Sequence, residues 1–456
     1  MKRLLLRLLI VLMAVSLVAI SSLAGCKKEE VAAEKEVVAI EEAEAAPAEE
    51  EAAQDVKTGD KPYSGVEITV IAQRTPAWES IDDGLPAFQE ETGMKVSIQY
   101  FEELDRRSKT RMDSSTGAGA YDVYYVDEAN ISEFVNADWL VPLLDYYPEK
   151  YDYNDFYNWM RNVGSIDGVP YYAPTFGGGD FMFYRKDVLE KESIPVPTNL
   201  DELLEAVKKV NNPPDMYGFV TRGLRGSGAN VWRWQDYFKA FGGEWLDENG
   251  APTFNSPAAV KATQYYMELL KYSPPGTTTS TFVDNIEAFR AGKVAFFIDG
   301  DVFYDWMEDE TKSEVVGLVG YLAPPVPLPS GAYTHGLAIS AIGAETEIEK
   351  EAAGEFIGWA TSKEMEMIRL KSLLIMGNRA STLNSPEAQE IYPKEVLDAI
   401  EARGEVTEIT FMRIPEWPGI GDYLGIVLEE IFTGNRTDIQ AALDEAVKNA
   451  EDLLSK

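Results

Sequence analysis

The sequence predicts an α/β protein of more than one domain, and three observations lead to this fold class. The chain has 456 residues, 45% of them hydrophobic, which is ample for a sizeable core and predicts more than one domain. Between residues 66 and 126 apolar strands alternate with helical segments, an order that produces a parallel sheet with right-handed crossovers. Further on, the glycines at 177–179 interrupt an aromatic run, and we interpret this break as a crossing between two lobes.

The N-terminus has the features of an export signal. A basic start precedes the apolar run 8–20, which is too short for a comfortable membrane span. The run ends in Leu23-Ala24-Gly25-Cys26, which resembles the lipobox of bacterial lipoproteins, where the cysteine is acylated. We therefore expect residues 1–25 to be removed and Cys26 to anchor the exported protein in the cell membrane, facing the extracellular space or the periplasm. An ordinary signal peptide followed by a stray cysteine is the alternative.

Residues 26–62 form a segment of different composition, rich in Glu, Ala and Lys. Its few large apolar residues cannot form a core, and its excess of negative charge favours an extended chain. The segment is therefore expected to be an acidic, disordered tether between the membrane and a globular body. A charged tail with a binding role of its own is the alternative.

Composition excludes several classes of function. The formal net charge is −36, from 77 acidic and 41 basic residues, so the protein repels nucleic acid. The single histidine and single cysteine argue against a structural zinc site and disfavour a Ser-His-Asp triad. We expect no metal and no cofactor.

The globular body begins with strands at 66–72, 95–100 and 121–126 and helices at 78–92 and 102–115. Gly93 is the stop signal of the first helix. Ligands of parallel sheets bind outside the carboxyl ends of the strands. The first strand is followed by Gln-Arg-Thr-Pro and lacks a glycine-rich phosphate loop, which disfavours nucleotide binding.

Several segments carry a family resemblance. Phe88–Val96 has the pattern F-x-x-x-T-G-x-x-V, and the third strand opens with Tyr121-Asp122-Val123. Together with four later segments, they resemble the bacterial extracellular solute-binding proteins, the family of maltose-binding protein and of sugar- and polyol-binding lipoproteins of ABC importers. The resemblance covers nearly all of residues 63–456. The four later segments are 181–210, 241–270, 288–301 and 435–453.

The resemblance implies a periplasmic-binding-protein-like fold of two α/β lobes joined by a hinge with three crossings. The crossings are expected near Ala173–Tyr184, Ala323–Leu337 and Met376–Leu383. One lobe would combine residues 63–174 with 331–376, and the other 175–325 with 378–456.

The resemblance also implies a function without chemistry. The protein would bind a sugar, oligosaccharide or polyol in the cleft between the lobes and deliver it, as a monomer, to the permease subunits of an ABC importer. A peptide, or an anion held by Arg74 and Arg379, remains open. The alternative of another class is a lipid-anchored glycoside hydrolase, which needs two carboxylates roughly 5–10 Å apart. No motif among the 77 acidic residues singles out such a pair.

A sugar receptor needs aromatic rings for stacking and polar side chains for hydrogen bonds. Relatives can carry a cleft carboxylate at the position of Gly178, so its missing side chain is expected to open space. Each predicted contact also has a structural alternative: packing for the tryptophans, capping for the aspartates, ion pairing for the arginines, a helix start for Glu128 and Asn130, and a structural role for the histidine. By alignment on the family motifs, the predicted ligand contacts are Arg74, Thr75, Trp78, Glu128, Asn130, Asn230, Trp232, Asp299, Asp301, His335, Arg379 and Trp417.

Overall fold

The computed structural model describes residues 61–74, 78–373 and 377–455. The predicted export signal, the predicted lipidation site Cys26, nearly all of the predicted tether and the predicted contact Thr75 lie outside these residues. The described residues belong to one unit, Val56–Lys456. No helix within the described residues is long and apolar enough to cross a membrane.

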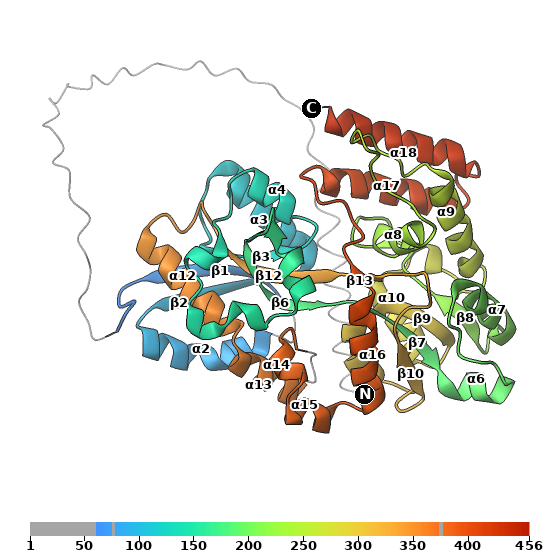
Figure 1. Cartoon of the computed structure of the whole chain (residues 1–456), viewed down its shortest axis with the longest axis horizontal. Helices are drawn as coiled ribbons and strands as arrows, with labels where there is room; N and C mark the ends of the chain where they lie inside the picture. The colour runs from blue at the N-terminus through green and yellow to red at the C-terminus, as the bar shows by residue number, and fades with distance from the viewer. Residues whose placement is uncertain (1–60, 75–77, 374–376, 456) are drawn as a thin grey trace, which may run out of the picture. The chain divides into compact units, whose positions relative to one another are not determined.

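The first lobe is built around a five-stranded sheet (Figure 1). Its first three strands are parallel, as predicted, and β12 lies antiparallel between β3 and β6. A strand from far along the sequence thus completes the sheet. In spatial order the strands are β2 (Lys95–Phe101), β1 (Glu67–Gln73), β3 (Val123–Asp127), β12 (Tyr333–Ile339) and β6 (Tyr172–Gly178).

Helices α2 (Glu79–Thr92), α3 (Glu103–Thr116) and α12 (Glu347–Ala360) pack against this sheet. Both predicted helices end at left-handed glycines, Gly93 with φ of 80° and Gly117 with φ of 68°. Residues with a Cβ disfavour this conformation, so the glycines fix where α2 and α3 stop. Helix α12 begins with a capping box between Thr346 and Glu349.

The second lobe contains a four-stranded sheet, in which β7 lies antiparallel to both neighbours and β8 runs parallel to β9. Strand β9 is buried at every position and β7 at nearly every position, because helices cover both faces. In spatial order the strands are β10 (Val319–Leu322), β7 (Asp180–Arg185), β9 (Val294–Gly300) and β8 (Tyr217–Val220).

One face of this sheet packs with helices in a large apolar core, and the opposite face packs in another. Figure 1 shows α17 and α18 side by side at the outer edge of this lobe. The first core includes residues of α7 (Leu200–Val210), α8 (Asn230–Ala240), α9 (Pro257–Leu270), α17 (Trp417–Phe432) and α18 (Ile439–Leu454). The second includes residues of α10 (Phe282–Arg290), α11 (Tyr304–Met307) and α16 (Lys394–Glu405).

The chain passes between the lobes three times. Strand β6 of the first sheet leads through Gly179 into β7 of the second, as the glycine run predicts. The return runs from β10 through β11 (Ser330–Gly331) into β12. The last crossing follows α13 (Lys363–Leu373), which packs against α2, and leads to α14 (Ala380–Leu383), whose Leu383 lies in the core of the second lobe.

The remaining elements are short segments at the lobe surfaces and between the lobes. They are α4 (Ile131–Asn136), α5 (Asn158–Val163), β4 (Ser165–Ile166), β5 (Val169–Pro170), α6 (Lys186–Glu192), α15 (Pro386–Ile391) and β13 (Thr407–Glu408), with 3-10 turns at Leu143–Asp145, Glu149–Tyr151, Tyr153–Asp155, Thr277–Thr279 and Asp301–Phe303.

Candidate functional site

The junction of the two lobes brings several of the predicted contacts together. In the first sheet His335 of β12 lies between Asp127 of β3 and Phe176 of β6. These strands reach the edge of the sheet where β6 continues into the second lobe. The strand order therefore places the end of β3, with Asp127 and Glu128, next to the crossing strands.

Asp127 holds the centre of this edge through two arginines of α3. Arg106 donates from Nη2 to both carboxylate oxygens, at 2.5 and 2.7 Å, and Arg107 donates from Nε to Oδ2. Burial alone would raise the pKa of Asp127, but the two guanidinium groups outweigh it and hold the pKa far below its ordinary value. Asp127 is therefore ionised and fully committed to protein partners.

Glu128 is the opposite case. Its side chain is buried, and its Oε2 has no hydrogen-bond partner among the described residues, although His335 Nε2 lies 3.6 Å away. Burial, with the neighbouring charge of Asp127, raises the pKa of Glu128 to about 8. Burial also lowers the pKa of His335, which bonds Tyr125 through Nδ1 at 3.1 Å. At neutral pH this pair is a neutral carboxyl beside a neutral imidazole.

The raised pKa of Glu128 predicts how the stability of the protein depends on pH. The folded protein keeps this proton up to about pH 8, whereas the unfolded chain loses it near the ordinary value of 4.5. The folded state thus binds more protons in this window, so the free energy of unfolding falls as pH rises, by at most about 1.4 kcal/mol per pH unit. Urea unfolding between pH 6.5 and 8 should show a flatter decline for Glu128→Gln than for the wild type, because the contribution of His335 is the same in both proteins.

The matched control is Glu347→Gln, since this exposed carboxylate has a lowered pKa and no burial. Its pH profile in the same window should follow the wild type. A Glu128→Gln profile as steep as the wild-type one would show that the carboxyl is already ionised at neutral pH.

On the second lobe, Asp299 and Asp301 lie at the carboxyl end of β9. Asp299 binds Arg222 through two contacts of 2.8 and 2.5 Å. Asp301 binds Arg403 Nη2 at 2.5 Å and accepts a hydrogen bond of 3.1 Å from the Tyr333 hydroxyl. All of these side chains are at least mostly buried, so the two carboxylates reach the junction already paired.

The glycine run differs from the expected opening. A Cβ at Gly178 would lie 2.0 Å from Asp301 Oδ1 and 2.6 Å from the Tyr333 hydroxyl. The space beside Gly178 is therefore filled by these two side chains, and the expectation that it widens the cleft is wrong. Gly179 has the same role toward Ser330, whose Oγ would lie 2.2 Å from a Cβ. The glycines allow close packing of the crossing strands.

Aromatic rings connect the lobes at the same place. Phe176 of β6 lies 5.8 Å from the ring of His335 and 6.0 Å from that of Tyr333, and Tyr333 lies 6.4 Å from Trp232 of α8. We call Phe176, Trp232, Tyr333 and His335 the interlobe ring cluster. It combines a predicted contact from each lobe with two aromatic residues that the prediction omitted.

The other two tryptophans lie within the lobes. Trp78 is 2% exposed and meets Tyr100 and Tyr125 edge to face in the core of the first lobe. Trp417 is 1% exposed at the start of α17 and packs on Trp245. Packing accounts for both rings.

The remaining predicted contacts have structural partners. Asn230 is fully buried, and its Nδ2 donates to the Gly425 carbonyl at 2.8 Å. Asn130 is the residue that precedes α4. Arg74 is exposed, lies over the Tyr100 ring and is 3.7 Å from Asp82.

Arg379 is buried and bound on every side. It donates to the carbonyl oxygens of Thr361 and Asp152 and to the Tyr147 hydroxyl, and its guanidinium lies 3.9 Å from the centre of the Phe156 ring. Its partners come from the segment 147–156 of the first lobe and from Thr361, which follows α12, so Arg379 fixes the third crossing in place.

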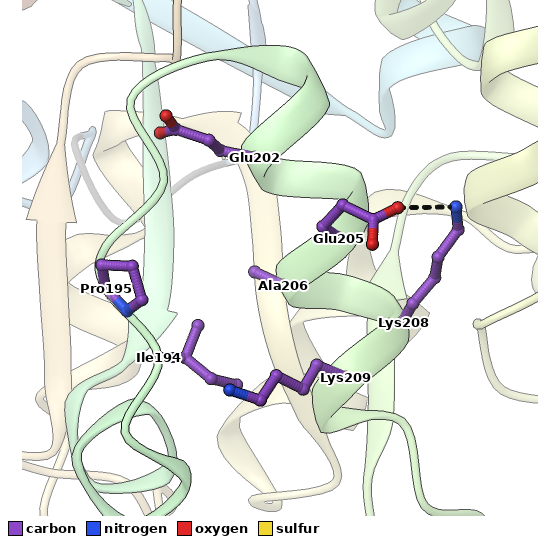
Figure 2. A pocket seen from close by; sticks show the side chains of 7 residues that line it. All are labelled: Ile194, Pro195, Glu202, Glu205, Ala206, Lys208 and Lys209. Carbon is purple, nitrogen blue, oxygen red and sulfur yellow. Dashed lines mark hydrogen bonds and ion pairs between the residues drawn. The ribbon is translucent and has the colours of Figure 1, made fainter.

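A separate pocket of about 430 Å³ lies on the second lobe, between α7 and the segment after α6 (Figure 2). Ile194 and Pro195 face Ala206 across it, and Glu205 pairs with Lys208 at its rim. It has no aromatic lining residue, and its lining contains none of the predicted contacts. Its full lining is Ile194, Pro195, Glu202, Glu205, Ala206, Lys208 and Lys209.

Comparison with known proteins gives the same picture as the fold. Residues 72–367 match the family model of the bacterial extracellular solute-binding protein. A mannitol-binding protein of Pseudomonas aeruginosa is 27% identical over 77% of this chain and 85% of its own length.

Solved structures agree over most of the chain. An ABC transporter solute-binding protein of Agrobacterium radiobacter, in complex with ribitol, is 29% identical, with a TM-score of 0.77 over 86% of this chain and 100% of its own. One of Agrobacterium vitis, with bound D-mannitol, is 26% identical, with a TM-score of 0.75 over 85% of this chain and 98% of its own. The chain belongs to the bacterial extracellular solute-binding proteins.

Proposed function

We propose that this protein binds a neutral, hydroxyl-rich ligand, a polyol or a sugar, at the lobe junction and delivers it to the permease of an ABC importer. The observation that carries the proposal is the pairing of charge at the junction. Four arginines at the junction are already bound to carboxylates: Arg106 and Arg107 to Asp127, Arg222 to Asp299, and Arg403 to Asp301. An anionic ligand would have to compete with these carboxylates, whereas hydroxyl groups can bond to the paired groups without displacing them.

The interlobe ring cluster supplies the apolar surface that such a ligand requires. Similarity to proteins that bind mannitol and ribitol supports a polyol as the first ligand to test. The lobes 63–174 with 331–376 and 175–325 with 378–456 would close around it as units. Cys26 would carry the lipid anchor that keeps the monomer at the membrane. A hydrolase on carbohydrate is the second class, and no described carboxylate pair favours it.

The test is a binding screen by thermal denaturation and calorimetry. Mannitol, ribitol and maltose are compared with gluconate, which carries a carboxylate in place of a terminal hydroxymethyl group of a hexitol. A ligand at 100 times its Kd stabilises the folded state by about 2.7 kcal/mol. A rise in Tm with a polyol or sugar, and none with gluconate, is expected. Tighter binding of gluconate would contradict a neutral ligand, and turnover of an oligosaccharide would favour the hydrolase.

Replacing Trp232 by alanine is expected to raise the Kd for the polyol at least 10-fold, about 1.4 kcal/mol in binding free energy. Trp232 is the ring that the second lobe contributes to the interlobe ring cluster, and it lies 6.0 Å from Phe411 on its other side. Calorimetry on the folded variant measures the effect. The control is Trp359→Ala, because this ring stacks on Phe88 within the first lobe and should leave the Kd unchanged. Equal affinity of the Trp232 variant would remove this ring from the site.

A further inference from the structure

The loop from Arg222 to Asn230 joins β8 to α8 and faces the first lobe. Arg222 clamps its start, because the guanidinium binds Asp299 and also donates from Nη1 to the Gly228 carbonyl at 3.0 Å. Four of the loop's nine residues make side-chain hydrogen bonds, and three others are glycines. The four are Arg222, Arg225, Ser227 and Asn230. The loop is therefore held by side chains and not by a strand or helix of its own.

Helix α17 holds the other side of the loop. Arg225 binds Glu429 through its backbone N–H at 2.9 Å and through its guanidinium. Ser227 donates to Asp422 from both its backbone N–H, at 3.1 Å, and its hydroxyl, at 2.8 Å. Asn230 closes the series through its bond to Gly425. The ties lie along one side of α17.

Two glycines of α17 let the loop approach this closely. A Cβ at Gly425 would lie 2.4 Å from the backbone nitrogen of Gly226, and a Cβ at Gly421 would lie 2.7 Å from Ser227 Cβ. Larger residues at either position would push the loop away from α17. The position of the loop is thus set by the helix behind it.

Across the junction, two ion pairs hold the side chain of Arg107 of α3. Its Nε binds the buried Asp127, and its Nη2 lies 2.9 Å from Glu103. The remaining nitrogen, Nη1, lies 3.6 Å from the point that a Cβ of Gly228 would occupy. The Arg107 guanidinium of the first lobe, held by its ion pairs, therefore lies next to the 222–230 loop of the second lobe, which α17 holds.

We propose that Arg107 and the 222–230 loop form the contact that closes the two lobes over the ligand, with α17 as the support that positions the loop; this rests on the function proposed above. Because the two sides belong to different lobes, the contact exists only when the lobes are together. A contact made only in the closed state shifts the population toward that state and so tightens ligand binding. Arg107 and Gly228 thus set affinity through closure.

The test places a charge at residue 228, whose φ is not positive and which has no atom closer than 3.6 Å to an added Cβ. In Gly228→Asp the new carboxylate can pair with Arg107, and in Gly228→Lys the new ammonium is repelled by it. The expected Kd for mannitol falls about twofold to fivefold in the first variant and rises by a similar factor in the second. In an Arg107→Met background, where Arg106 still neutralises Asp127, both effects should vanish. Unchanged Kd values, or effects that persist without Arg107, would overturn the proposal.

A second measurement separates this inference from the ligand assignment. Spin labels at Met112→Cys and Val326→Cys, both 60% exposed, report the interlobe distance in the full chain with Cys26→Ser. Met112 belongs to α3 of the first lobe, and the backbone N–H of Val326 donates to the Thr198 carbonyl of the second lobe at 3.0 Å. Without ligand, Gly228→Asp should enrich the shorter distance and Gly228→Lys the longer one. A distance response without binding of any polyol or sugar would leave the contact standing and refute the ligand class. Identical distance distributions in the three proteins would refute the contact.

Discussion

Replacing Arg233 by methionine is expected to lower the free energy of unfolding by about 3–5 kcal/mol. The guanidinium is 2% exposed and lies 2.7 Å from Asp180 Oδ1 and 3.5 Å from Asp236 Oδ2. Without this guanidinium, the buried carboxyl groups of Asp180 and Asp236 lose the positive charge with which both are paired. Burial already raises the pKa of Asp180 and of Asp236 against the pull of Arg233, so both would take up protons in the variant. Urea unfolding at pH 7 measures the loss.

The control is Arg436→Met in an exposed pairing. Arg436 bonds Glu430 and Glu445 at 2.6 and 2.7 Å, but water and salt screen these charges, so its removal should cost less than about 1 kcal/mol. The Arg233 variant should also lose less stability at pH 5 than at pH 7, because its carboxyl groups are neutralised more easily there. A loss below about 1 kcal/mol for Arg233→Met would mean that the buried carboxyl groups are already neutral in the wild type.

The strands and helices of the first lobe could be predicted because their signals are local. Alternating or continuous apolar residues mark β1, β2 and β3, and a glycine that adopts the left-handed conformation stops each of the helices between them. The observed bounds differ from the predicted ones by no more than two residues. Strand β12 was harder, because its antiparallel place between β3 and β6 depends on a partner more than 150 residues away.

The candidate site depends even more on contacts between residues that are far apart in the sequence, and such contacts were hard to predict. His335 and Trp232 were predicted from the motifs around them, and both lie in the interlobe ring cluster. The ion pairs that neutralise the junction were not predictable, since Asp301 and Arg403 are about a hundred residues apart and only the fold joins them. Arg107 was missed because a helix rich in charge gives no local sign of which guanidinium faces the other lobe. Arg222 did have a signal, since it lies two residues after the end of strand β8.

The glycine run was predicted as a crossing but misread as open space, and this error leads to the second large effect. Gly178→Ala is expected to lower the free energy of unfolding by about 3 kcal/mol. The new methyl group would lie 2.0 Å from Asp301 Oδ1, and this oxygen cannot simply move away, because Arg403 holds the carboxylate in a buried position. Urea unfolding of the purified variant measures the loss.

A double-mutant cycle shows whether Asp301 causes this cost. Asp301→Ala alone leaves Arg403 buried without its carboxylate and should cost about 3–5 kcal/mol. In that background Gly178→Ala should cost less than about 1 kcal/mol, because the colliding oxygen is gone and only the Tyr333 hydroxyl remains close. The matched control is Gly404→Ala in α16, where no atom lies within 4 Å of an added Cβ, so the substitution should be neutral or stabilise by up to about 1 kcal/mol. Additive losses at 178 and 301 would mean that the glycine is required by the backbone of the crossing and not by the carboxylate beside it.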